Sequence, residues 1–201
     1  MTCKRGRLAV CLGLGSIGIL AILAMFMSHK TEGGGLLPPA VEIGGPFTLA
    51  SSRGGTVLSA DLAGKPYAVF FGLTHCPEVC PTTLYELSGS LEKLGNAASG
   101  MRVFFITVDP ERDTVESLRD YLASFDPRIE GLVPTLADLP RLASDFRVYY
   151  TKSPTSDGSY TMDHTASIFL FDAAGRFSGT LAYGEAAILR EAKLRRLLGL
   201  P

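Results

Sequence analysis

The chain has 201 residues and a formal net charge of −1, with 19 Lys and Arg against 20 Asp and Glu. This balance, without a basic stripe among aromatic residues, argues against a nucleic-acid-binding protein. Hydrophobic residues make up 46% of the chain, which excludes general disorder. Apart from an apolar N-terminal segment, the remaining length suits one domain with its own core.

Residues 1–28 are predicted to form a membrane anchor. The run from Leu8 to Met27 is apolar and uncharged, and three basic residues precede it. A helix of this length rises ~1.5 Å per residue and spans roughly 30 Å, the thickness of a hydrocarbon core. The basic residues predict a cytoplasmic N-terminus, with the rest of the chain outside. A cleaved signal peptide is the competing interpretation, but its apolar region is usually shorter and it ends in a better cleavage site.

Residues 29–45 are predicted to be a tether, and residues 46–201 a single domain. Glycines and prolines gather in the tether, which is typical of a segment with flexible and stiffer parts. The domain then opens with the apolar stretches 47–49 and 56–58, which flank a glycine-containing turn and predict a hairpin.

The next segments predict a strand–helix–strand unit. Stretches 67–73 and 101–108 are almost wholly apolar, as expected of strands buried on both faces. Between them, stretch 82–94 carries leucines every three or four residues, which predicts an amphipathic helix. Two strands joined in this way pair in parallel.

The later part predicts further helices and a second hairpin. Helices are expected at 114–125, 139–146 and 185–198, and antiparallel strands at 167–172 and 177–183. Asp113 or Thr114 is expected to cap the first of these helices, while Asp109 and Asp113 are expected to stabilise turns. The order predicts an α/β fold, with a mixed sheet whose parallel centre comes first and whose hairpin edge comes last.

The sequence THCPEVCPTT places two cysteines, Cys76 and Cys80, directly after the buried strand 67–73. Pro81 disfavours helical geometry at the residue before it and is tolerated at the start of a helix. Cys80 is therefore expected near a helix N-terminus, and Cys76 in the preceding loop. Unpaired backbone N–H groups and the positive end of the helix dipole favour thiolates there.

Several interpretations of this pair are open. Two thiols that merely fill a core would usually lie within regular elements rather than beside prolines in a loop. A structural disulfide is compatible with an oxidising compartment, although closing so short a loop stabilises little. A thioredoxin-type redox pair has two intervening residues, whereas Pro77, Glu78 and Val79 separate these cysteines. Two thiolates are also an incomplete ligand set for a soft metal.

A histidine is the expected third ligand, and the domain offers only two. His75 adjoins Cys76, so its side chain is expected to point away. His164 is expected in a loop before strand 167–172, from which it can lie opposite the thiols. Asp163 is a candidate to orient this imidazole, with a solvated loop carboxylate as the alternative.

Cys76, Cys80 and His164 would together form a soft set of three ligands. Such a set suits Cu(I), and also Cu(II) when water or a weak fourth ligand joins. Zinc is the weaker candidate, because a structural zinc site usually has four protein ligands.

Four stretches, FFGLTHCPEVCPTTL, ITVDPERDT, FRVYYTKS and MDHTASIFLFDAAGRF, stand in the order and spacing of the Sco/SenC family of copper proteins. The chain resembles this family from about Phe47 to its C-terminus. The resemblance implies a thioredoxin-like fold and a copper site of Cys76, Cys80 and His164. It also implies a role in assembling the binuclear copper centre of cytochrome c oxidase.

The implied partner is the copper-bearing oxidase subunit, with other copper chaperones as further candidates. Family members act outside the bacterial cytoplasmic membrane or in the mitochondrial intermembrane space. The short basic N-terminus lacks a mitochondrial transit segment, so we expect a single-pass bacterial membrane protein with an extracytoplasmic domain.

A copper metallochaperone, rather than an enzyme, is the function that we expect. One alternative is a thiol–disulfide oxidoreductase that reduces the copper-site cysteines of the oxidase, with Cys76 or Cys80 as the attacking thiolate. The other is a peroxiredoxin-like peroxidase, which shares the broad fold and needs only an activated cysteine and a peroxide.

Overall fold

The computed structural model of the protein describes residues 42–156 and 158–201. The predicted anchor and most of the predicted tether lie outside these residues. Within the two described ranges, no helix combines the length and the apolar character needed to cross a membrane.

The described residues form nine strands, four α-helices and two short 3-10 helices. The strands are β1 (Thr48–Ser51), β2 (Thr56–Leu58), β3 (Tyr67–Gly72), β4 (Arg102–Thr107), β5 (Ile129–Val133), β6 (Tyr150–Pro154), β7 (Tyr160–His164), β8 (Ile168–Phe171) and β9 (Phe177–Leu181). The helices are α2 (Val79–Leu94), α3 (Val115–Leu122), α4 (Leu139–Asp145) and α5 (Ala187–Leu197), with 3-10 turns η1 (Ser59–Leu62) and η2 (Gly95–Ala98).

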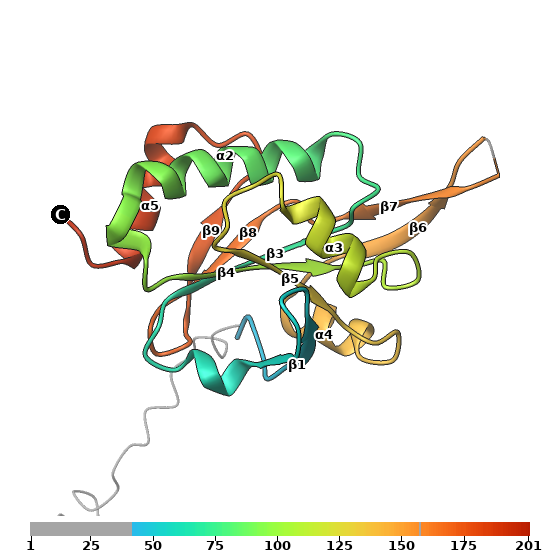
Figure 1. The fold of residues 1–201 in the computed structure, drawn as a ribbon, viewed down its shortest axis with the longest axis horizontal. Coiled ribbons are helices and arrows are strands. Elements are labelled where there is room, and N and C mark those ends of the chain that lie inside the picture. The colour runs from blue at the N-terminus through green and yellow to red at the C-terminus, as the bar shows by residue number, and fades with distance from the viewer. Residues whose placement is uncertain (1–41, 157) are drawn as a thin grey trace, which may run out of the picture. The chain divides into compact units, whose positions relative to one another are not determined.

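Seven strands form one mixed sheet in the order β2-β1-β5-β4-β3-β8-β9. β3 and β5 each pair in parallel with β4, whereas β8 and β9 continue the sheet antiparallel. Helices α2 and α5 lie side by side on one face and α4 on the other (Figure 1). This is a thioredoxin-like α/β fold, and it confirms the predicted parallel centre and hairpin edge.

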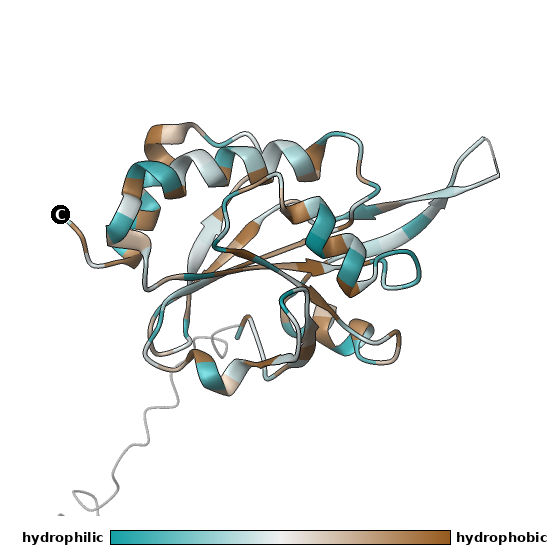
Figure 2. Cartoon of the chain, viewed as in Figure 1, coloured by the Kyte–Doolittle hydropathy of each residue, from teal (hydrophilic) through white to brown (hydrophobic). Residues whose placement is uncertain are grey.

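The core lies on both faces of the central strands. Every residue of β3 is buried, and five of the six residues of β4 are buried beside it. The hydropathy colouring shows these strands as apolar along much of their length, whereas the helices alternate (Figure 2). A strand that is buried on both faces has no polar side, which explains its continuous apolar run.

Five phenylalanines form a cluster on the α4 side of this core. Phe146, which follows α4, lies 5.3–6.4 Å from the ring centroids of Phe47, Phe71, Phe169 and Phe171. Most of these pairs are edge-to-face, the arrangement that the quadrupoles of aromatic rings favour. Phe146 is fully buried, and its ring contacts connect the end of α4 to strands β3 and β8.

The structure decides between the two residues expected to cap α3. Thr114, not Asp113, caps α3: its hydroxyl accepts from the Ser117 amide at 3.2 Å, and the Ser117 hydroxyl accepts from the Thr114 amide at 2.8 Å. This capping box leaves the Asp113 carboxylate available for other contacts.

One expectation from the sequence, the surroundings of His164, is corrected. This residue ends strand β7 instead of lying in a loop before the next strand. β7 pairs only with β6, in a separate two-stranded sheet that extends from the body of the domain as an arm (Figure 1). Neither this arm nor strand β5 was predicted from the sequence.

The contribution of the Phe146 cluster to the stability of the core can be tested by substitution. We expect Phe146→Ala to lower the free energy of unfolding by about 3–5 kcal/mol, because it leaves a cavity among four rings. Tyr85, whose ring is mostly exposed on α2, provides an aromatic control, and Tyr85→Ala should stay within about 0.5 kcal/mol of the parent. Urea denaturation would measure both, and equal effects would contradict the assigned core.

Candidate metal centre

The two cysteines lie where strand β3 gives way to helix α2. Cys76 is half-buried in the connecting loop, and Cys80 is fully buried in the first turn of α2. Glu78 occupies the N-cap position without a side-chain hydrogen bond to the helix. Instead, the Cys80 amide donates to the Cys76 sulfur at 3.3 Å. This sulfur therefore accepts a hydrogen bond from an N–H group that has no partner within the helix.

Gly72, the last residue of β3, allows the first turn of α2 to pack closely against the end of this strand. A β-carbon at position 72 would lie 2.9 Å from the Cys80 sulfur and 2.5 Å from a carbon of the Phe105 ring. Both distances are too short for packed atoms, so a side chain here would displace the thiol. Glycine therefore sets the depth at which Cys80 is buried.

His164 reaches the thiols from the base of the arm. Its Nε2 atom lies 3.5 Å from the Cys80 sulfur, and its Nδ1 atom lies 3.0 Å from the carbonyl oxygen of Thr165. A hydrogen bond to that carbonyl requires the proton on Nδ1, which leaves the lone pair of Nε2 directed toward the thiols.

The ligand atoms of Cys76, Cys80 and His164 all lie within 4.8 Å of one another. With bonds of ~2.3 Å to sulfur and ~2.0 Å to imidazole nitrogen, ligand atoms around one ion stand up to roughly 4.6 Å apart. The three atoms therefore lie at about the spacing that a single transition-metal ion requires. Their chemistry, two sulfurs and one imidazole, suits a soft metal.

The two thiols hold their protons very differently. A hydrogen bond from the Cys80 thiol lowers the pKa of Cys76 to about 3, against an opposing effect of burial, and the amides of Cys80 and Glu78 add to the lowering. The same hydrogen bond, with burial, raises the pKa of Cys80. At neutral pH, one negative charge thus rests on Cys76 and one proton on Cys80.

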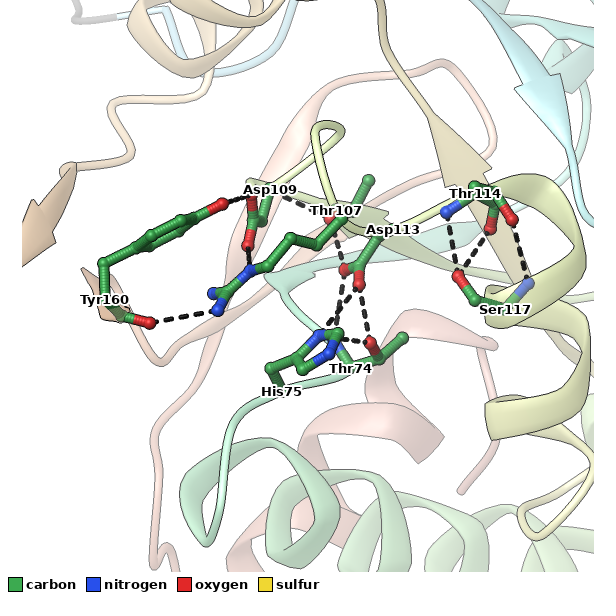
Figure 3. A network of polar contacts seen from close by, with 9 residues as sticks. Thr74, His75, Thr107, Asp109, Asp113, Thr114, Ser117 and Tyr160 are labelled. Carbon is green, nitrogen blue, oxygen red and sulfur yellow. Dashed lines mark hydrogen bonds and ion pairs between the residues drawn. The ribbon is translucent and has the colours of Figure 1, made fainter. Parts of the chain in front are cut away.

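The remaining candidate residues point elsewhere. His75 turns toward Thr74 and Asp113, with Nδ1 at 3.0 Å from the Thr74 hydroxyl and 3.6 Å from the Asp113 carboxylate (Figure 3). Asp163 is exposed and accepts a hydrogen bond from Ser153 at 2.6 Å. The orienting role considered for Asp163 therefore falls to the Thr165 carbonyl.

The model of the SCO1/SenC family matches residues 37–199 of the chain. Among curated relatives, the mitochondrial protein SCO1 homolog 1 of Arabidopsis thaliana is 37% identical over 136 residues. This match covers 67% of the chain but only 41% of that protein, so the chain corresponds to less than half of the relative's length.

Solved structures agree with this relationship. The structure of Bradyrhizobium japonicum ScoI with copper bound is 46% identical, with a TM-score of 0.72, and the match covers 77% of this chain and 99% of that one. BsSco, described as a member of the Sco family of cytochrome c oxidase assembly proteins, has a TM-score of 0.62 over 83% of this chain and 99% of its own. At 18% identity, BsSco supports the fold alone.

The family model spans most of the chain, including both cysteines and His164, and the fold agrees with it. The chain belongs to the SCO1/SenC family.

Proposed function

We propose that the protein is a copper metallochaperone that holds copper through Cys76, Cys80 and His164. The observation that carries this proposal is the convergence of these three soft ligand atoms within 4.8 Å. They come from a loop, a helix and a separate arm, so their meeting is a property of the folded chain. ScoI, a relative with 46% identity, binds copper.

The exposure of the ligands favours transfer over storage. Cys80 is fully buried, but Cys76 and His164 are only half-buried. Three protein ligands leave a trigonal ion open to an incoming thiolate. A partner can therefore displace Cys76 or His164 first and Cys80 last, so the ion changes ligands one at a time.

We infer that the copper acceptor is the subunit of cytochrome c oxidase that bears its binuclear centre, with other copper chaperones as further partners. Membership of the SCO1/SenC family supports this inference, because the motifs that the chain shares with this family imply a role in assembling that centre. The proposed activity is delivery, so copper is the cargo and the protein is not an enzyme in this role.

The proposal includes a bacterial cytoplasmic-membrane location. Residues 1–28 would anchor the chain, residues 29–45 would tether it, and residues 46–201 would bind copper on the extracytoplasmic side. The apolar run and the basic residues before it support this arrangement. Gly44, near the proposed end of the tether, donates its amide to the Asp145 carbonyl at 2.8 Å.

A second candidate function is thiol–disulfide exchange with the cysteines of the same oxidase site. The observation that favours it is the Cys76 thiolate next to the protonated Cys80. Cys76 would attack a partner disulfide, and Cys80 would then displace the partner to leave a Cys76–Cys80 disulfide. The peroxiredoxin-like alternative stays a prediction from the sequence.

His164 offers the sharpest test of the copper site. We expect His164→Ala to weaken Cu(II) binding more than about 100-fold, because even partners of metal ligands commonly contribute 10–100-fold. The thiolate-to-Cu(II) absorption band should disappear with it. His75→Ala is the matched control, since this imidazole adjoins Cys76 but lies outside the ligand group. Titration of each protein with Cu(II), followed by absorption spectroscopy, would measure both effects. Unchanged copper binding in His164→Ala would contradict the proposal.

The thiolate on Cys76 predicts an unusual pH profile for the metal-free protein. Alkylation of an ordinary thiol slows about tenfold per pH unit below its pKa of about 8.5. Because the pKa of Cys76 is about 3, its alkylation should stay nearly constant between about pH 5 and pH 8.

Cys80→Ala removes the hydrogen bond that lowers the pKa of Cys76, so the reaction of this variant should slow as the pH falls. Mass spectrometry of the alkylated peptide would measure both rates. A steep profile in the parent would show that Cys76 holds its proton and would remove the support for thiol–disulfide exchange.

A further inference from the structure

The segment Asp109–Asp113, which joins β4 to α3, lies between the two parts of the chain that carry the metal ligands. One part is the loop that leads to Cys76, and the other is the arm that ends in His164. Figure 3 shows Asp113 directed toward Thr74 and His75, and Asp109 directed toward Tyr160. Both aspartates are 1% exposed.

Asp113 holds the loop that leads to Cys76. Its carboxylate accepts from the Thr74 amide at 3.0 Å, from the Thr74 hydroxyl at 2.5 Å and from the Thr107 hydroxyl at 2.6 Å. Thr74 precedes Cys76 by two residues. A buried carboxylate with three short hydrogen bonds is firmly placed, so it fixes the start of the cysteine loop against the end of β4.

Arg112 and Asp109 hold the arm. The Arg112 guanidinium pairs with the Asp109 carboxylate and donates to the Tyr160 carbonyl at 3.0 Å, and it stacks 3.8 Å above the Tyr160 ring. The Tyr160 hydroxyl donates to Asp109 at 2.9 Å. Tyr160 therefore contacts this segment through its backbone, its ring and its hydroxyl. A planar guanidinium is well suited to the first two contacts, because it can donate to the carbonyl and stack on the ring.

The arm needs such contacts because the sheet does not hold it. Among the described strands, β6 and β7 pair only with each other, and an isolated hairpin is marginally stable in water. Met162 packs against the core near the base of the arm. Tyr160 lies four residues before His164, at the opposite end of β7, so its contacts determine the direction in which the strand approaches the thiols.

We propose that Asp109, Arg112 and Asp113 are positioning residues for the Cys76–Cys80–His164 site. Within one short segment, Asp113 binds the cysteine loop, and Asp109 and Arg112 bind the arm that carries His164. The three ligands therefore converge before any metal binds. This inference rests on the proposed function, because the site that the segment positions is the proposed copper site.

The test uses the full chain in detergent, with Cys3→Ser and Cys11→Ser so that only the site cysteines remain. The variant is Arg112→Gln, which removes the ion pair and the stacked cation. Asp109→Asn with Arg112→Gln is made in parallel, because it leaves no buried charge unpaired if the single variant folds poorly.

A second ion pair supplies a matched control. Arg128 pairs with Asp126 at 2.6 Å, and their side chains are 24% and 7% exposed, close to the 22% and 0% of Arg112 and Asp109. Asp126→Asn with Arg128→Gln therefore removes a comparable interaction that does not contact the arm or the cysteine loop.

The first measurement is hydrogen exchange in the metal-free protein. We expect amides of residues 160–164 to exchange roughly tenfold faster in both Arg112 variants, while those of β3 and β4 are unchanged. The second is Cu(II) affinity, which should fall about 10–100-fold with a shifted thiolate charge-transfer band. The control pair should leave both measurements at their parent values.

Parent-like exchange in the arm and parent-like copper affinity would overturn the inference, as would equal losses in the control pair. The parent and His164→Ala are titrated alongside. If the parent binds no copper, or if His164→Ala binds it equally well, the proposed function fails. The exchange measurement still decides whether the segment positions the arm, so the two failures remain distinguishable.

Discussion

The close approach of helix α2 to the end of strand β3 is the contact on which the site depends. Gly72 leaves room for the Cys80 sulfur, and the first turn of the helix then presents its amides to Cys76. Both thiols thus lie at the positive end of a helix dipole, one buried and one accessible. The chemistry of the site follows from this placement, because it allows one proton to be shared between two sulfurs.

That shared proton links the two candidate functions. Binding a metal through both sulfurs requires loss of the proton on Cys80, and attack on a disulfide requires the thiolate on Cys76. The same pair of thiols can therefore bind a metal ion when one is present and attack a disulfide when one is present. His164 separates the two roles, since it completes a ligand set but is not needed as a nucleophile.

Local patterns predicted much of the fold. The buried strands β3 and β4 appear as apolar runs, and the intervening helix as a leucine stripe, because each pattern arises within one element. Strand β5 was missed because Glu130 and Gly131 interrupt its apolar run. In the fold, Glu130 accepts from Ser51 and Arg102, which are distant in sequence, so its burial has no local signal.

Local signals in the sequence also marked the three residues of the candidate site, but not the arm or the contacts that hold them. The cysteines are marked by their spacing and prolines, and His164 by the scarcity of histidines in the domain. The arm that carries His164 is rich in tyrosine and polar residues, so its strands show no clear apolar alternation in the sequence, although the Asp157–Gly158 dipeptide is a known hairpin signal. The role of Asp113 was missed because an aspartate before a helix is typical of a cap, and its partner Thr74 lies 39 residues earlier.

X-ray absorption spectroscopy of the Cu(I)-loaded protein examines the convergence of the three ligands most directly. We expect two sulfur neighbours and one imidazole nitrogen around the copper, with the nitrogen lost when His164 is replaced. A copper ion held by two sulfurs alone in the parent protein, with no imidazole in its shell, would contradict the account.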